Sequence, residues 1–175
     1  MFISESLTGQ KVTLRPFKEN DIVYWSTWDV DPEIQEYLPE PHLTAMDQLA
    51  HLEYFADCLV ALDELHATVV LNATEEPVGT IAITEIDNYH GVGELGIVIG
   101  NKSEWGKGIA TEAISIMLSE VQKTLRRITA EFEKDNAAVQ KSLIKNGFET
   151  EAICVRSRIK NGQEIDTVRM VKFLK

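Results

Sequence analysis

The beginning of the chain alternates between the pattern of a strand and that of a helix. Residues 11–17 (KVTLRPF) alternate polar and apolar side chains, which predicts a half-buried strand. Residues 19–28 predict a short helix with Asn20 or Asp21 as its N-cap. Residues 29–41 contain three prolines and five acidic side chains, so an irregular or briefly helical surface connector is expected there.

An amphipathic helix and three strands are expected next. Apolar side chains recur at helical spacing through residues 44–65, and Thr44 and Asp47 have the spacing of a capping box. Three runs rich in β-branched residues follow, separated by Asn, Asp, Pro and Gly, and this arrangement favours an antiparallel meander. The three predicted strands are residues 66–71, 78–86 and 93–100.

The second half alternates helix and strand before ending in a hairpin. Its periodicity predicts a helix over residues 109–125, a strand over 126–132, and a helix that ends at Asn146-Gly147, a natural C-cap pair. Asn161-Gly162 separates two alternating runs, which is the strongest short signal for a hairpin. The predicted hairpin strands are residues 151–159 and 164–174. No repeat or linker divides the chain, so we expect residues 1–175 to form a single domain.

Composition and charge narrow the classes of partner. The 175 residues include 28 Asp and Glu but only 17 Lys and Arg, giving a formal charge of -11. This charge repels phosphate backbones, so nucleic acid is not expected as a ligand and an amine is favoured. No apolar run reaches the ~18 residues of a spanning helix. Two distant cysteines without a metal-binding motif favour a cytoplasmic, reduced protein with no structural metal.

The segment SEWGKGIATEAI (residues 103–114) places two glycines directly before a predicted helix. A strand that ends in Gly106-Lys107-Gly108 before a helix presents unpaired backbone N–H groups at the positive end of the helix dipole. Glycines let an anion such as phosphate approach the backbone itself. Taken alone, however, the glycine pair is equally compatible with a tight turn.

This segment, with the helices and strands around it, resembles the acetyl-CoA core of the GNAT superfamily of N-acetyltransferases. WGKGIATEA and the carboxy-terminal RSRIKNGQEIDTVRMVKFL look like the branch that acetylates ribosomal-protein N-termini, the RimJ/RimL-like enzymes. The resemblance implies an α+β GNAT fold over the whole chain. That fold is a central, mostly antiparallel twisted sheet of about seven strands, flanked by helices in three layers.

The resemblance also implies which residues hold the coenzyme, acetyl-CoA, without a metal. Backbone groups of the strand before the loop would pair with the pantetheine amides, and the loop and the first turn of the next helix would hold the pyrophosphate. Asn136 would reach the coenzyme arm, although it is also a good N-cap, and the two roles are compatible. The strand and loop residues are Ile97, Val98, Ile99, Trp105, Gly106, Lys107, Gly108, Ile109, Ala110 and Thr111.

The chemistry of acetyl transfer requires a proton acceptor. An alkylamine is almost wholly protonated near neutral pH, so some group must accept a proton before the nitrogen can attack the thioester, and a carboxylate is the natural candidate. Glu94 is the first candidate and Glu85 the second; each is alternatively a solvated or paired acid. Many family members place a tyrosine that protonates the thiolate where this chain has Leu143, and the neighbouring Ser142 is a substitute donor.

The acceptor is expected between the first helices and the sheet. Acidic and aromatic residues of the connector suit an amine, which can belong to a protein or peptide N-terminus, a polyamine or an aminoglycoside. An acyl-CoA-binding sensor or interaction module without activity is the alternative, and a monomer and a homodimer remain equally open. The acceptor-binding candidates are Trp28, Glu33, Tyr37, Tyr89 and His90.

Overall fold

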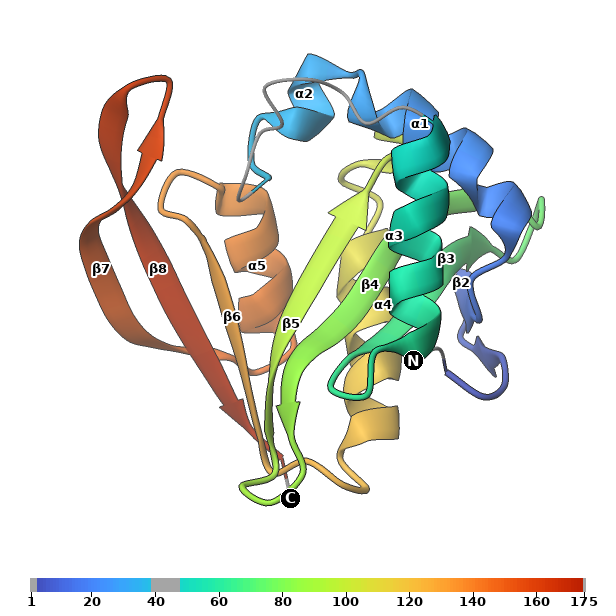
Figure 1. The fold of residues 1–175 in the computed structure, drawn as a ribbon. Helices are drawn as coiled ribbons and strands as arrows, with labels where there is room; N and C mark the ends of the chain where they lie inside the picture. Colours follow the sequence, from blue (N-terminus) through green and yellow to red (C-terminus); the bar gives the residue numbers. More distant parts are fainter. Residues whose placement is uncertain (1–2, 39–47, 175) are drawn as a thin grey trace.

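The described strands form one curved sheet, which is antiparallel on both sides of a single parallel pair. The computed structural model describes residues 3–38 and 48–174, and within them eight strands pair in the order β1-β2-β3-β4-β5-β6-β8-β7 (Figure 1). Among the described strands, only β5 and β6 pair in parallel. The α+β class is thus confirmed. The strands are β1 (Leu7–Thr8), β2 (Val12–Arg15), β3 (Leu65–Leu71), β4 (Pro77–Asp87), β5 (Val92–Ile99), β6 (Arg127–Glu133), β7 (Glu149–Lys160) and β8 (Gln163–Phe173).

Helices cover both faces of the sheet, which gives the expected three layers. On one face lie α1 (Ile22–Asp29), α2 (Pro32–Gln35) and α3 (Gln48–Val60), and on the other lie α4 (Ile109–Val121) and α5 (Ala137–Lys145) (Figure 1). The predicted capping box at Thr44 and Asp47 lies outside the described residues. Among the described residues, no helix is long and apolar enough to cross a bilayer.

The main core lies between the sheet and α4. Every third or fourth residue of α4 is buried, as the helical period requires, and Ile114 and Met117 are fully buried. They meet a sheet face that includes Leu14 and Ile83, which are also fully buried. Because each such side chain contributes about 1.5–3 kcal/mol on burial, this layer dominates the stability of the fold.

A second, smaller core holds α1 and α3 on the opposite face. Trp25 of α1 contacts Phe17, with ring centroids 4.8 Å apart, and Cys58 of α3 belongs to the same buried cluster. Beside this cluster the buried carboxylate of Asp21 accepts hydrogen bonds from Arg15 at 2.6 and 2.8 Å. The start of α1 is therefore tied to β2, from which Arg15 comes.

The parallel pair β5–β6 is short, and the two strands then separate. Their register covers only Val92–Glu94 against Arg127–Thr129, whereas β5 stays paired with β4 as far as Ile99 (Figure 1). From Leu95 onward, one edge of β5 therefore has no strand partner in the described sheet. An unpaired edge of this kind can pair with an extended ligand.

Candidate active site

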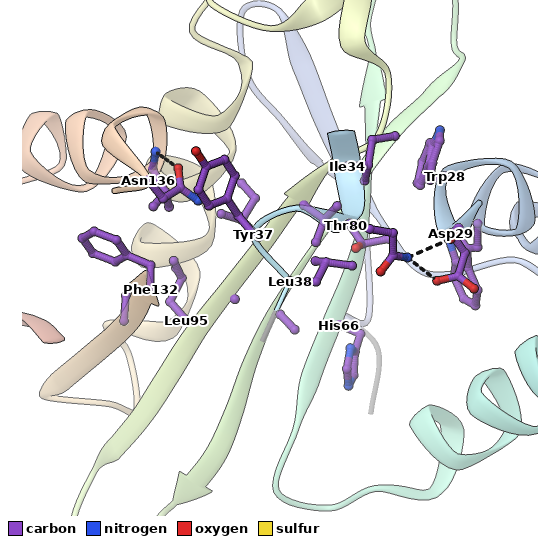
Figure 2. A pocket seen from close by; sticks show the side chains of 18 of the residues that line it. Trp28, Asp29, Ile34, Tyr37, Leu38, His66, Thr80, Leu95, Phe132 and Asn136 are labelled. Atoms are coloured by element: carbon purple, nitrogen blue, oxygen red, sulfur yellow. Dashed lines mark hydrogen bonds between the residues drawn. The ribbon is translucent and has the colours of Figure 1, made fainter. Parts of the chain in front are cut away.

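A cavity of about 640 Å³ opens at the point where β5 and β6 separate. Gly96 and Val98 of β5 line its floor together with Ala82 of β4. Figure 2 shows Asn136 and Phe132 on one side of the cavity and Trp28 and Asp29 on the other. The cavity thus connects the face covered by α5 with the face covered by α1 and α2.

The glycine loop directly precedes α4. Gly106 has a φ of 75° and Gly108 a φ of 85°, both in the left-handed region that favours glycine. Gly108 is the N-cap of α4 and supplies no side-chain hydrogen bond to it. A Cβ atom at Gly106 would meet nothing within 4 Å. The backbone of this loop is therefore open to a ligand, and the first N–H groups of α4 lie behind it.

Lys11, just before β2, is a cation at this loop that sequence reasoning missed. Its Nζ donates a hydrogen bond of 2.8 Å to the carbonyl oxygen of Lys107 and lies 3.6 Å from the Cβ position of Gly108. Its backbone N–H donates to Glu112 of α4 at 2.8 Å. No local pattern signals this contact, because Lys11 and Lys107 are 96 residues apart.

Several other residues predicted for the loop have contacts that hold the loop to the rest of the protein. Trp105 donates from Nε1 to the carbonyl oxygen of Ile99 at 2.8 Å, so its indole ties the loop to the end of β5. The side chain of Lys107 pairs with Glu104 at 3.0 Å. Ile109 is buried in the core, and the Thr111 carbonyl accepts a hydrogen bond from Asn146.

The residues predicted at the coenzyme arm lie along the separation of β5 and β6. Ile97 and Val98 line the cavity, and Ile99 packs against the main core. Asn136 also lines the cavity and is the N-cap of α5, since its Oδ1 accepts from Val139 N at 3.2 Å (Figure 2). Its position allows both of the roles expected for it.

Glu94 lies at the closed end of the separation, on the last pair of β5 with β6. Burial raises the pKa of Glu94, and the carboxylates of Glu85 and Glu131 raise it further, while Arg169 and Arg158 oppose the shift. Both Glu94 and Glu85 line a small polar recess next to the main cavity. Glu85 is exposed and has a φ of 51° within a bulge of β4.

Glu131 of β6, which the sequence did not suggest, lines the cavity and pairs with Arg158 and Arg169. Burial alone would raise its pKa, but hydrogen bonds from Thr167 and Arg169 and the charge of Arg158 lower it below the ordinary value. Arg169 donates to Glu131 from Nε and Nη2 at 3.0 and 2.7 Å. Glu131 is thus held as a paired anion, whereas Glu94 is the acid with the raised pKa.

The predicted proton donor of α5 does not line the cavity. The Ser142 hydroxyl donates back to the Ala138 carbonyl at 3.1 Å, within its own helix. Leu143, where many relatives have a tyrosine, is fully buried in the main core. Val139 is the residue of α5 that lines the cavity together with Asn136 at its N-cap.

The predicted acceptor residues lie in two distant places. Trp28 and Tyr37 line the cavity. Glu33 does not line it; Glu33 and Asp31 pair with Lys102 of the segment after β5. Tyr89 and His90 form the β4–β5 turn at the opposite end of these strands, and Tyr89 is 91% exposed (Figure 1).

A family model for the GNAT acetyltransferase domain matches residues 11–149. The chain belongs to the GNAT acetyltransferase family. It is an N-acetyltransferase, and the matched region contains both the glycine loop and the separated strands of the cavity.

Relatives of this acetyltransferase extend over its whole length. An uncharacterized N-acetyltransferase p20 from Bacillus licheniformis is 28% identical, covering 98% of this chain and 97% of its own. Among solved structures, the ribosomal L7/L12 α-N-protein acetyltransferase RimL in complex with coenzyme A has a TM-score of 0.88 at 15% identity, covering 97% of this chain and 98% of its own. Spermidine N-acetyltransferase from Vibrio cholerae, solved with CoA and spermine, has a TM-score of 0.85 at 21% identity, with coverage of 95% and 97%.

Proposed function

We propose that this acetyltransferase transfers an acetyl group from acetyl-CoA to a primary amine by direct attack of the amine on the thioester. The observation that carries the proposal is the free edge of β5 after Glu94, with the glycine loop beyond its end and the cavity at its side. Acetyl-CoA supplies the activated acetyl group. Cys58 is buried and Cys154 is half-buried, and neither lines the cavity, so no cysteine is placed for a covalent intermediate.

Three parts of the chain would hold the coenzyme. The N–H groups of the Gly106–Gly108 loop and the start of α4 would bind the pyrophosphate, and Lys11 would add a positive charge. The backbone groups on the unpaired edge of β5 between Leu95 and Val98 would pair with the amides of the coenzyme arm, while the Ile99 carbonyl already accepts from Trp105. Asn136 would contact the same arm from the start of α5 while capping that helix.

Glu94 is our candidate for the general base. A carboxylate with a raised pKa is a better proton acceptor near neutral pH than an ordinary one. Glu94 lies two residues from Gly96 of the cavity floor, so it would take the proton of the amine directly or through one water. Ser142 remains a proposed donor to the thiolate; because it does not line the cavity and its hydroxyl donates to the Ala138 carbonyl, its proton would have to pass through a water.

The loop offers a matched pair of variants to test the proposal. Gly106 and Gly162 both have a φ of 75°, and at neither would a Cβ atom meet anything within 4 Å. The substitutions Gly106→Glu and Gly162→Glu therefore introduce the same charge with the same backbone strain, but only the first lies in the loop. In calorimetric titration with acetyl-CoA and desulfo-CoA, Gly106→Glu should lose binding at least tenfold while Gly162→Glu matches the wild type.

Turnover is measured separately by thiol release with a panel of amines. Acetylation of one class of amine supports transfer to that class. Tight coenzyme binding without turnover on any amine would favour the acyl-CoA-binding module. Equal binding by the Gly106→Glu and Gly162→Glu variants would contradict the assignment of the loop.

A further inference from the structure

Three side chains of the types that bind zinc meet between α3 and β3. Cys58 lies in the last turn of α3, Glu64 in the loop that follows, and His66 near the start of β3. Each offers one ligand atom, and these three atoms all lie within 4.8 Å of one another. Cys58 and His66 are both buried, so the group belongs to the folded interior and is not a cluster of surface acids.

The distances within this group are close to those that one metal ion requires. Nε2 of His66 lies 2.7 Å from Oε2 of Glu64, so these two side chains already face each other. In a tetrahedral site with bonds of about 2.0–2.3 Å, two ligand atoms lie about 3.3–3.7 Å apart. Side-chain adjustments of about 1 Å would therefore bring all three atoms to bonding distance of one ion.

The charges of the group also suit a divalent cation in a buried place. The thiolate of Cys58 and the carboxylate of Glu64 would carry two negative charges and the imidazole none, so bound Zn²⁺ would leave the group uncharged. A buried group without net charge avoids most of the cost of burying an ion. On binding, the S–H bond of Cys58 would break, an S–Zn bond would form, and the proton would pass to solvent.

Aromatic rings surround the group. The ring of His66 contacts those of Phe17 and Tyr54, with centroids 5.5 and 6.3 Å away. Cys58 belongs to the buried cluster that also contains Phe17 and Trp25. An apolar shell of this kind limits the access of water and lowers the local dielectric constant, which strengthens the attraction between an ion and its ligands.

We propose that Cys58, Glu64 and His66 form a zinc site whose fourth position is open to water. The thiolate and the imidazole select zinc over magnesium and calcium, which prefer oxygen ligands. A bound ion would link the end of α3 to the start of β3, and because His66 lines the cavity, it would also hold one part of the cavity wall in place (Figure 2). This site goes against our expectation of a protein without a structural metal, which rested on the absence of a cysteine-based motif. The proposal does not depend on the transferase function.

Zinc binding can be measured on the whole protein without acetyl-CoA or an amine. Protein stripped with EDTA and kept reduced is titrated with Zn²⁺ in competition with a chromophoric chelator. It is also titrated with Co²⁺, whose bond to a thiolate produces a charge-transfer band. We expect a single Zn²⁺ per chain, the charge-transfer band with Co²⁺, and no displacement by Mg²⁺ or Ca²⁺. With free Zn²⁺ at about 100 times its Kd, the Tm should rise by about 5–11 °C.

The two cysteines of the chain provide a matched pair of variants. Cys58→Ser removes the thiolate with little change in size, and Cys154→Ser makes the same change in β7, outside the group. Cys58→Ser should weaken Zn²⁺ binding about 100-fold or more, because loss of a partner that only orients a ligand already costs about 10–100-fold. It should also abolish the cobalt charge-transfer band. Cys154→Ser should behave like the wild type in both measurements.

Glu64→Gln tests the same site without a change in the buried core. Glu64 is half-buried, and a glutamine there keeps the shape and can still accept a hydrogen bond from His66. The variant should stay folded without metal and bind Zn²⁺ about tenfold more weakly or worse. Asp63→Asn is its control, since Asp63 is an exposed acid of the same loop outside the group, and it should leave the affinity unchanged.

Two results would overturn the proposal. Absence of Zn²⁺ binding by the wild type would show that Glu64 and His66 are only a hydrogen-bonded pair beside a buried cysteine. Binding that both Cys58→Ser and Glu64→Gln leave unchanged would show an adventitious ion elsewhere. If Cys58→Ser does not fold, the comparison of Glu64→Gln with Asp63→Asn decides. Neither result affects the transferase function, because acetyl-CoA binding and thiol release are measured separately.

Discussion

Two glycines of neighbouring strands provide a test that separates the cavity from the stability of the fold. Gly96 lies on the cavity floor in β5, and a Cβ atom there meets open space at an ordinary backbone conformation. Gly79 lies in β4, and a Cβ atom there would be 2.2 Å from the carbonyl oxygen of Val98. The two glycines have similar sequence surroundings. The backbone excludes a side chain at Gly79, whereas the fold leaves space for one at Gly96.

The expected magnitudes follow from these surroundings. Gly96→Ala should stabilise the protein by about 0.5–1 kcal/mol, because the strand then loses less backbone entropy on folding. Gly96→Leu should remain at least as stable as the wild type, since its side chain enters an existing cavity. Gly79→Ala must displace backbone and should cost about 1–3 kcal/mol. At roughly 2–4 °C per kcal/mol for a chain of this size, Gly79→Ala should lower the Tm by about 2–12 °C.

The assay pairs thermal unfolding with the initial rate of thiol release. Gly96→Leu should reduce kcat/KM by about 100-fold or more at unchanged Tm, because the side chain fills the space between the coenzyme edge of β5 and the acceptor wall. Gly79→Ala should show the reverse pattern: a lower Tm, with activity retained below it. Full activity in Gly96→Leu would refute our assignment of the cavity as the place of acetyl transfer.

Three further outcomes are expected from single substitutions. Glu94→Gln should reduce kcat/KM about 100-fold. It should also abolish a limb of the pH–rate profile that lies above the ordinary pKa range of a glutamate, because the pKa of Glu94 is raised. If this limb persists in the variant, Glu94 is excluded as the base. Asn136→Ala should destabilise the protein by about 1 kcal/mol as a lost N-cap and also raise the KM for acetyl-CoA, whereas a purely structural cap would change only the stability. Burial would raise the pKa of Asp21, but hydrogen bonds from Arg15, Lys18 and Thr68 lower it overall. The ionised Asp21 carboxylate therefore stabilises the folded protein fully above pH 3.8, and this stabilisation is lost as the pH falls through the lower pKa of the folded state. Asp21→Asn should therefore cost about 3 kcal/mol at pH 7 and progressively less below pH 3.8 in denaturant titrations, and a cost that does not depend on pH would contradict this.

Local patterns predicted most of the elements because their physical causes are local. The predicted helix over residues 109–125 corresponds to α4, and the repeat of buried residues in it is the helical period itself. The Asn161-Gly162 turn was also predictable, since both residues adopt a positive φ, as this type of hairpin requires. The two-residue β1 was missed because a pairing so short leaves no periodicity to detect.

The arrangement of the site depends on contacts between distant segments and was only partly predictable. Tyr89 and His90 were chosen for their closeness to Glu94 in sequence, but they form the turn before β5, and the cavity floor begins further along that strand. From Val92 to Gly96 a strand rises about 14 Å at ~3.4 Å per residue, so the turn points away from the cavity. The separation of β5 from β6 has no local signal either, because it results from which strand pairs with which.

Charge pairing was the least visible property in the sequence, because it joins side chains that lie far apart along the chain. The acidic connector suggested a site for cations, but Asp31 and Glu33 pair with Lys102, which lies about 70 residues further along the chain. The composition gives only the number of acidic residues, whereas binding of an amine depends on which of their carboxylates lack a positively charged partner. The net charge of -11 therefore acts mainly through the electric field around the protein, which attracts any protonated amine. Lys102 carries one positive charge against the two negative charges of Asp31 and Glu33, so this cluster keeps a net negative charge that also attracts an amine.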